Sequence, residues 1–144
     1  LDVKAFYTAV ATCFPAYGKV FGKSIEGNLG AGGVDPTTPA MKAYRKAHME
    51  VTGKPADGWA SANTYVSLQV LEQAIEGVGS VDRKAVTQYI KDNTFKTIMG
   101  DINFVDQVSH RFWTVGQWQG GEFYGVASKG MPNAKPVILK KGWK

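Results

Sequence analysis

The sequence has few of the residues on which thiol, histidine and metal chemistry depend. Its 144 residues include one cysteine, Cys13, and two histidines, His48 and His110, which lie far apart along the chain. A single thiol forms no internal disulfide, and these three residues fall short of the four-ligand set of a structural zinc site. We therefore expect no metal site, and no motif in the chain leads us to expect a cofactor.

Long hydrophobic runs are absent as well. No stretch approaches the roughly 18 consecutive apolar residues that read as a membrane-spanning helix, and no basic segment followed by an apolar stretch precedes Leu1. We expect a chain that does not span a membrane, and either a removed leader or a chain that is part of something longer. The composition, 44% hydrophobic and 20% charged, is typical of a folded globular domain.

The net charge is +5, but the basic residues are not distributed as a nucleic-acid-binding surface requires. The lysines are scattered, and the densest group, Lys140, Lys141 and Lys144, lies beside the C-terminus. Binding to phosphates requires basic residues along one face, because the affinity comes from counterion release at many contacts. We therefore expect no nucleic-acid partner.

Hydrophobic periodicity and turn residues predict an α/β order of elements. The expected elements are a strand at 5–11, a helix at 15–21, a strand at 25–29, helices at 39–52, 57–78 and 80–93, alternating residues at 95–104, strands at 112–118 and 123–126, and an irregular tail after Ser128. Only one or two of these strands can pair in parallel. A doubly wound sheet needs more, so we expect the fold to be completed by missing chain or by a partner.

Local signals set most of the helix boundaries. Thr38 is a candidate N-cap before Pro39 and Asp57 before the long helix, while Ser80 is expected to cap the helix at 80–93. The long helix has apolar residues at helical spacing, which we predict to be its buried stripe. They are Tyr65, Leu68, Leu71, Ile75 and Val78.

No segment of the sequence has the spacing and neighbours of a catalytic motif. The segment 18–24, GKVFGKS, has three residues between its glycines where a phosphate-binding loop has four, and it follows a helix instead of preceding one. Cys13 has apolar neighbours typical of a buried, inert thiol. Asp101 and Asp106 are spaced as turn and edge carboxylates. Trp59, Trp113 and Trp118 could line a cleft, although core packing is the ordinary role of such residues.

In order and spacing, several segments resemble one known family. They are the helix from Pro39 with Tyr44–Ala47, the segment from Gly53 to Ile75, Gly79–Val86, Phe95–Phe104 and Gln117–Phe123, followed by a tail with Trp143. Together they resemble the C-terminal portion of the branched-chain amino acid type of ABC-transporter solute-binding proteins. That resemblance implies a partial type I periplasmic binding fold, with two lobes, hinge crossovers and the N-terminal half absent.

The resemblance also implies a division of the chain. Residues 1–34 would form a second-lobe segment, residues 35–111 the helical first-lobe segment with a hairpin, and residues 112–144 the return to the second lobe with the C-terminal tail. The hinge crossings would then contain the residues Gly32, Gly33, Pro36, Arg111 and Phe112. Glycines suit such positions because hinges absorb backbone rotation.

The function that the resemblance implies is solute capture without catalysis. A small solute (an amino acid, branched-chain or other, or a small organic or aromatic acid) would bind between the lobes, outside the cytoplasm, for delivery to an inner-membrane ABC permease. The expected contact residues are Tyr7, Thr8, Thr12, Phe14, Val34 and Asp35. Two alternatives stay open, a ligand-sensing receptor of the same fold and a Cys13-dependent hydrolase. An incomplete fold also predicts self-association, or pairing with its missing half, through exposed apolar surface.

Overall fold

The computed structural model describes residues 3–110, 114–127 and 134–141. In chain order the elements are β1 (Phe6–Thr8), the 3₁₀ turn η1 (Val10–Cys13), α1 (Pro15–Phe21), the 3₁₀ turn η2 (Gly22–Ile25), β2 (Asn28–Ala31), α2 (Pro39–Thr52), α3 (Ala60–Val78), α4 (Arg83–Asp92), β3 (Phe95–Thr97), β4 (Gly100–Ile102), β5 (Val115–Gln119) and β6 (Glu122–Ala127). The expected α/β order is therefore present.

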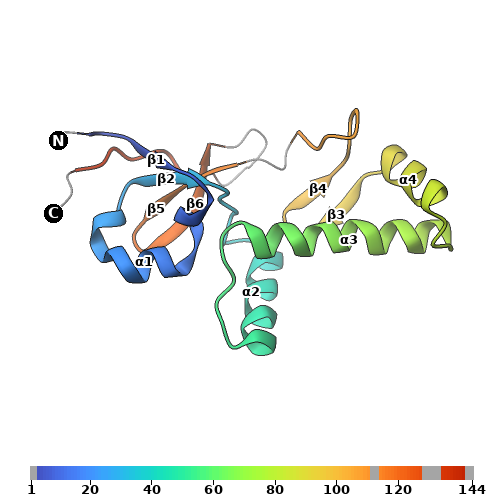
Figure 1. Ribbon diagram of the computed structural model, residues 1–144, viewed down its shortest axis with the longest axis horizontal. Helices are drawn as coiled ribbons and strands as arrows, with labels where there is room; N and C mark the ends of the chain where they lie inside the picture. Colours follow the sequence, from blue (N-terminus) through green and yellow to red (C-terminus); the bar gives the residue numbers. More distant parts are fainter. Residues whose placement is uncertain (1–2, 111–113, 128–133, 142–144) are drawn as a thin grey trace.

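A four-stranded sheet is built from both ends of the chain (Figure 1). Its order is β1-β2-β5-β6, with β1 parallel to β2 and the other neighbouring pairs antiparallel. The chain leaves this sheet after β2, forms the helical part from α2 to β4, and returns as β5 directly beside β2. The outgoing passage therefore begins, and the returning passage ends, on neighbouring strands of the sheet.

The sheet part has its own small core. Cys13, Ile25, Trp118 and Phe123 are buried together, and Trp59 from the helical part packs against them. The indole Nε1 of Trp118 donates to the carbonyl of Thr12 at 2.7 Å, which satisfies the ring's one polar atom inside the core. This core fixes η1 against β5.

The helical part follows the local signals of the sequence. The Thr38 hydroxyl accepts from the amide of Met41 at 3.2 Å, so Thr38 is the predicted N-cap of α2. Gly53 and Gly79 end α2 and α3 at φ +66° and +68°, a conformation that glycine adopts without the steric penalty of a Cβ. The helix expected from residue 57 begins at Ala60, with Trp59 and not Asp57 as its N-cap. Asp57 precedes the N-cap by two residues, and its carboxylate accepts from the amides of Trp59 and Ser61.

The predicted buried stripe of α3 is wrong for three of its residues. Tyr65, Leu68 and Leu71 are 45%, 58% and 42% exposed, while Ile75 and Val78 are half-buried. The buried side of the helix carries smaller residues instead, which pack against α2, α4 and the β3–β4 hairpin. They are Ala62, Val66, Val70 and Ala74.

Several predicted boundaries also need correction. The strand expected at 5–11 ends at Thr8 and gives way to η1, and the strand expected at 25–29 lies at Asn28–Ala31 because its pairing is set by β1 and β5. Asp82, not Ser80, caps α4 by accepting from the amide of Ala85. The positions Phe112 and Trp113 of the expected strand lie outside the described residues.

Candidate functional site

The two passages between the sheet part and the helical part are tied to each other. The amide of Gly32 donates to the carbonyl of Thr114 at 2.9 Å, and the buried Thr114 hydroxyl donates to the carbonyl of Gly33 at 2.7 Å. Gly32 and Gly33 have φ values of +91° and +103°. The predicted glycine bend thus lies where the outgoing passage runs beside the returning one.

The start of α3 packs into the same region. The amide of Gly58 donates to the carbonyl of Cys13 at 3.2 Å, and the amide of Gly33 donates to the carbonyl of Gly58. A Cβ at Gly32 would come within 2.7 Å of the Trp59 Cβ, so the two segments are in close contact. This junction lies beyond the carboxyl ends of the parallel strands β1 and β2, where open α/β sheets place their ligands.

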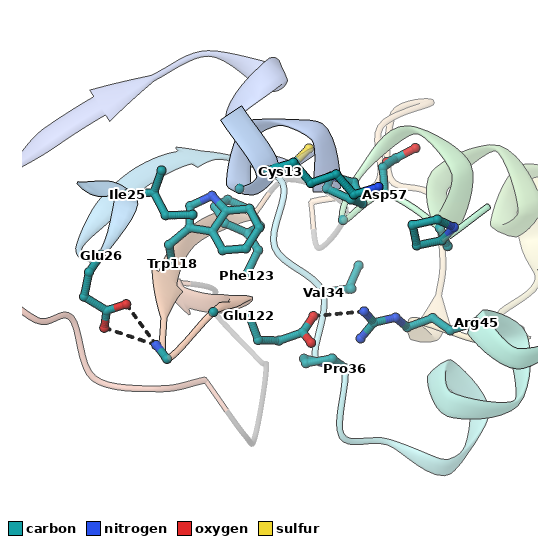
Figure 2. Close-up of a pocket in the computed structure, with 18 of the residues that line it drawn as sticks. Cys13, Ile25, Glu26, Val34, Pro36, Arg45, Asp57, Trp118, Glu122 and Phe123 are labelled. Carbon is teal, nitrogen blue, oxygen red and sulfur yellow. Dashed lines mark hydrogen bonds and ion pairs between the residues drawn. The ribbon is translucent and has the colours of Figure 1, made fainter. Parts of the chain in front are cut away.

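A groove of about 860 Å³ extends from this junction between the two parts (Figure 2). Its apolar floor includes Cys13, Ile25, Trp118 and Phe123 from the sheet part, and Val34, Pro36 and Met41 from the outgoing passage and α2. Charged residues from both parts line the rest of the groove. They are Lys19, Lys23, Glu26, Arg45, Asp57 and Glu122. A volume of this size suits a small organic molecule.

One ion pair crosses the groove. Arg45 on α2 and Glu122 on β6 point toward each other, with Nη2 and Oε1 3.0 Å apart (Figure 2). Both side chains are more than a third exposed, so the pair contributes at most about 1 kcal/mol to stability. The ion pair matters for its position, because it connects α2 of the helical part to β6 of the sheet part.

The predicted contact residues lie on two sides of the junction. Val34 lines the groove, whereas Tyr7 is 53% exposed in the middle of β1. The hydroxyls of Thr8 and Thr12 are hydrogen-bonded to each other, and Thr12 is buried. Of these four residues, only Val34 is part of the groove.

Two other predicted contacts have structural roles. Phe14 is half-buried against the core of the sheet part. The carboxylate of Asp35 accepts from the amide of Thr37 at 2.8 Å and from its hydroxyl at 2.5 Å, which shapes the turn before α2. Among the predicted hinge residues, Pro36 lines the groove, and Arg111 and Phe112 lie outside the described residues.

Sequence reasoning missed part of this region. Trp59, predicted to be a core residue that could also line a cleft, packs on the core and lies against the Gly32 bend. Arg45 and Glu122 had no signal, because residues separated by more than 70 positions meet only through the fold. Asp57 was predicted as a cap, but its place beside Cys13 in the groove was not.

The surroundings of the Cys13 thiol favour its protonated form, which is a poor nucleophile. It is 2% exposed, and Sγ donates to the carbonyl of Val10 at 2.9 Å. Burial raises its pKa from 9.0 to about 12, and the Asp57 carboxylate adds to the rise. Because the thiolate is the nucleophile, this environment is that of an inert cysteine.

We therefore expect slow labelling of Cys13 by a thiol reagent in the native protein and fast labelling in denaturant.

The raised pKa also means that the thiol's contribution to stability is fully present below pH 9 and is lost as the pH rises from 9 toward 12. The loss is about 1.4 kcal/mol per pH unit. Urea unfolding of the wild type and Cys13→Ala across pH 8–11 measures this loss. Rapid native labelling, or parallel pH profiles of the two proteins, would contradict the assignment.

Within the described ranges, no group of three or more His, Cys, Asp or Glu residues is arranged to hold a metal ion. In that same part of the chain, no helix is both long and apolar enough to cross a membrane.

Comparison with known proteins gives one sequence family and a group of solved structures. The family described as periplasmic binding protein matches residues 14–122, which is most of the chain. No curated protein matches the sequence. The family match begins directly after η1, ends at the first residue of β6, and includes most of the residues that line the groove.

Three solved structures illustrate the likeness. A leucine binding protein from Thermotoga maritima is 23% identical with a TM-score of 0.65, over 86% of this chain and 37% of that chain. A leucine-, isoleucine-, valine-, threonine- and alanine-binding protein from Brucella ovis, in a closed conformation, is 19% identical with a TM-score of 0.71, over 97% and 40%. A solute-binding protein of an ABC transporter from R. palustris, in complex with benzoate, is 16% identical with a TM-score of 0.61, over 81% and 34%.

These likenesses establish the fold and its extent. The chain has the α/β architecture of the type I periplasmic binding proteins, and it spans well under half the length of the structures it matches. The expected partial fold is confirmed.

Proposed function

The chain belongs to the periplasmic binding protein family, and on that premise we propose that it is part of the solute-binding component of an ABC importer, not an enzyme. The solute is a branched-chain or other amino acid, or a small organic or aromatic acid. It is captured outside the cytoplasm and delivered to an inner-membrane permease. The observation that carries this proposal is the family match across a chain that passes twice between two parts.

The topology supports a two-lobed assignment. In the proposed division, residues 1–34 and 112–144 are segments of one lobe and residues 35–111 belong to the other. The pairing of β2, after which the chain leaves the sheet, with β5, where it returns, supports this division. The outgoing passage contains Gly32 and Gly33, whose positive φ values are readily accessible to glycine. Rotation about such passages closes two lobes on a ligand without making or breaking a bond.

The proposed solute contacts lie at the junction. Tyr7, which is 53% exposed, is the middle residue of β1, and Thr8 ends the strand. Thr12 and Phe14 hold η1 in place, and Val34 with Asp35 forms the outgoing passage. The relatives' solutes, leucine and benzoate, both combine an apolar body with a carboxylate. They are therefore the first two solutes to test.

We expect Tyr7→Ala to weaken solute binding by about tenfold or more, because truncating an aromatic contact in a binding site commonly costs over 1 kcal/mol. Isothermal titration of the intact polypeptide with leucine and with benzoate measures the affinity. Val20→Ala, on α1 and 72% exposed, is the control, and its affinity is expected to stay unchanged.

The outcomes separate the function from the site. If neither these two solutes nor a wider panel of amino acids and organic acids binds, solute capture is refuted. If a solute binds and Tyr7→Ala retains wild-type affinity, the function holds and the placement of the contacts is wrong.

A further inference from the structure

The ion pair between Arg45 and Glu122 joins the two parts at a distance from the outgoing passage (Figure 2). That passage is bonded to the sheet where the carbonyl of Val34 accepts from the amide of Gly125 on β6. Glu122 begins β6 three residues earlier, which is about 10 Å along a strand. Arg45 lies six residues after Pro39, the first residue of α2, which is about 9 Å along a helix. Both members of the pair therefore stand on arms of about 10 Å.

Rotation of one part against the other separates the pair. Domain closure is a hinge rotation of this kind. In a rotation of about 20°, the end of an arm about 10 Å long moves by about 3.5 Å. Nη2 of Arg45 and Oε1 of Glu122 are 3.0 Å apart, so this movement takes them beyond the about 4 Å within which an ion pair forms. The pair therefore belongs to the observed arrangement of the two parts and not to a rotated one.

In the observed arrangement, the helical part touches the sheet part beside the predicted solute contacts. The amide of Gly58 donates to the carbonyl of Cys13, the last residue of η1, and Trp59 packs on the core of the sheet part. Thr12 and Phe14, two of the predicted contacts, flank Cys13 in the chain. The ion pair thus accompanies an arrangement in which the start of α3 lies against the segment that carries these contacts.

The exposure of the pair limits its strength and makes it sensitive to salt. The side chains of Arg45 and Glu122 are 36% and 38% exposed. An exposed pair of this kind shifts an equilibrium by at most about fivefold. Dissolved salt weakens it further, because the screening length falls from about 10 Å at 0.1 M to about 3 Å at 1 M. A contact of this strength biases two arrangements of similar stability without fixing either one.

We propose that Arg45 and Glu122 are positioning residues that form a latch between the two parts. Their ion pair favours the arrangement in which the start of α3 lies against η1, and thereby favours retention of the solute. Neither residue is among the predicted solute contacts, so the latch acts through the arrangement of the parts. Its effect on affinity rests on the proposed solute capture, whereas its effect on the arrangement does not.

The first test measures the arrangement without a solute. Val20→Cys on α1 and Val51→Cys on α2 provide one spin-label site on each part, at positions that are 72% and 85% exposed. The buried Cys13 is left in place. Double electron–electron resonance on the intact polypeptide then gives the distribution of distances between the labels. At low salt we expect one main distance. Its population relative to all others is expected to fall by about fivefold in Arg45→Glu and at 1 M salt, and to recover at low salt when Glu122→Arg is added to Arg45→Glu.

The second test measures the consequence for solute capture. Titration of the intact polypeptide with leucine and with benzoate is expected to show binding weakened by up to about fivefold in Arg45→Glu, because the solute must restore a less populated arrangement. The double variant with Glu122→Arg is expected to recover the wild-type affinity. Lys46→Glu is the matched control, because it makes the same charge change one residue away and breaks only the pair with Glu50 within α2. It is expected to change neither the distances nor the affinity.

Three results would overturn the proposal. Distances that stay unchanged both in Arg45→Glu and at 1 M salt would show that the pair does not hold the parts together. An equal change in Lys46→Glu would assign the effect to the charge of α2 in general. Unchanged or tighter solute binding by Arg45→Glu would show that the pair does not favour the solute-retaining arrangement. If no solute binds any form, the proposed function fails, while the label distances still decide whether the latch exists. The salt comparison needs no charge reversal and decides the same question if a variant does not fold.

Discussion

Replacement of Gly33 by alanine is expected to lower the free energy of unfolding by about 3 kcal/mol. Gly33 has φ +103°, and holding a residue with a Cβ in such a region costs about 1 to 3 kcal/mol. The added Cβ would also lie 2.6 Å from the Gly116 Cα and 3.1 Å from the Gly125 Cα. These are backbone atoms of β5 and β6, so the sheet must shift, and overpacking of this kind costs about 1 to 3 kcal/mol more.

Gly53→Ala is the matched control for this variant. Gly53 also has a positive φ, +66°, but a Cβ there meets no atom within 4 Å. It is expected to cost only about 1 kcal/mol, the penalty of the left-handed conformation alone. Urea unfolding of both variants measures the difference. Equal losses for the two would show that the close approach of the passage to the sheet is not as described.

Sequence signals predicted most reliably what is decided locally. Thr38 followed by Pro39 predicted the start of α2, and Gly120 and Gly121 predicted the β5–β6 turn, where both adopt positive φ. Such positions are set by one or two backbone angles and one hydrogen bond. The bounds of β2 were less accurate, because they depend on pairing with β5, some 90 residues later.

The error in α3 has a physical cause. Apolar residues recur at three- and four-residue spacing on two sides of this helix. The prediction took the side with the larger side chains, including Leu68 and Leu71, as the buried one. Small residues such as Ala62 and Ala74 are completely buried because they let neighbouring elements approach closely. Periodicity shows that a face is apolar, but not which part of the molecule covers it.

The candidate site was predictable only in outline. The glycines at 32 and 33 indicated a bend near a contact, and Pro36 and Val34 do line the groove. The bond from the Thr114 hydroxyl to the carbonyl of Gly33 joins residues 81 positions apart, and no local pattern encodes it. The same holds for the pair Arg45 and Glu122.

The irregular C-terminal segment, as predicted, forms no strand among its described residues, yet it is held across the sheet. The amide of Lys135 donates to the carbonyl of Gly125 on β6, and the amide of Lys140 donates to the carbonyl of Lys4 before β1. Between these points Ile138 bonds to Gln117 on β5. Because each of these contacts is polar, the segment depends on hydrogen bonds rather than on a hydrophobic core.

Replacement of Gln117 by leucine is expected to cost about 3 kcal/mol and to release this segment. Gln117 is 1% exposed, and its Nε2 donates to the carbonyls of Gly27 and Ile138 at 2.9 and 2.8 Å. Its Oε1 accepts from the amide of Ile138 and from Gln119 Nε2, both at 2.9 Å. Leucine fills a similar volume but leaves three backbone groups without these partners, at about 1 kcal/mol each.

Gln119→Leu is the control that distinguishes the loss of the Gln117 hydrogen bonds from a general loss of polarity on β5. Gln119 bonds to the carbonyl of Pro136 in the same segment, but its side chain is only partly buried, so water can replace the lost partner. We expect it to cost about 1 kcal/mol or less. Hydrogen exchange is the specific measurement, because in Gln117→Leu the amides of Ile138 and Lys140 lose protection before the rest of the sheet does. If Ile138 stays protected in Gln117→Leu, or both variants lose equal stability, Gln117 is not what holds the segment to the sheet.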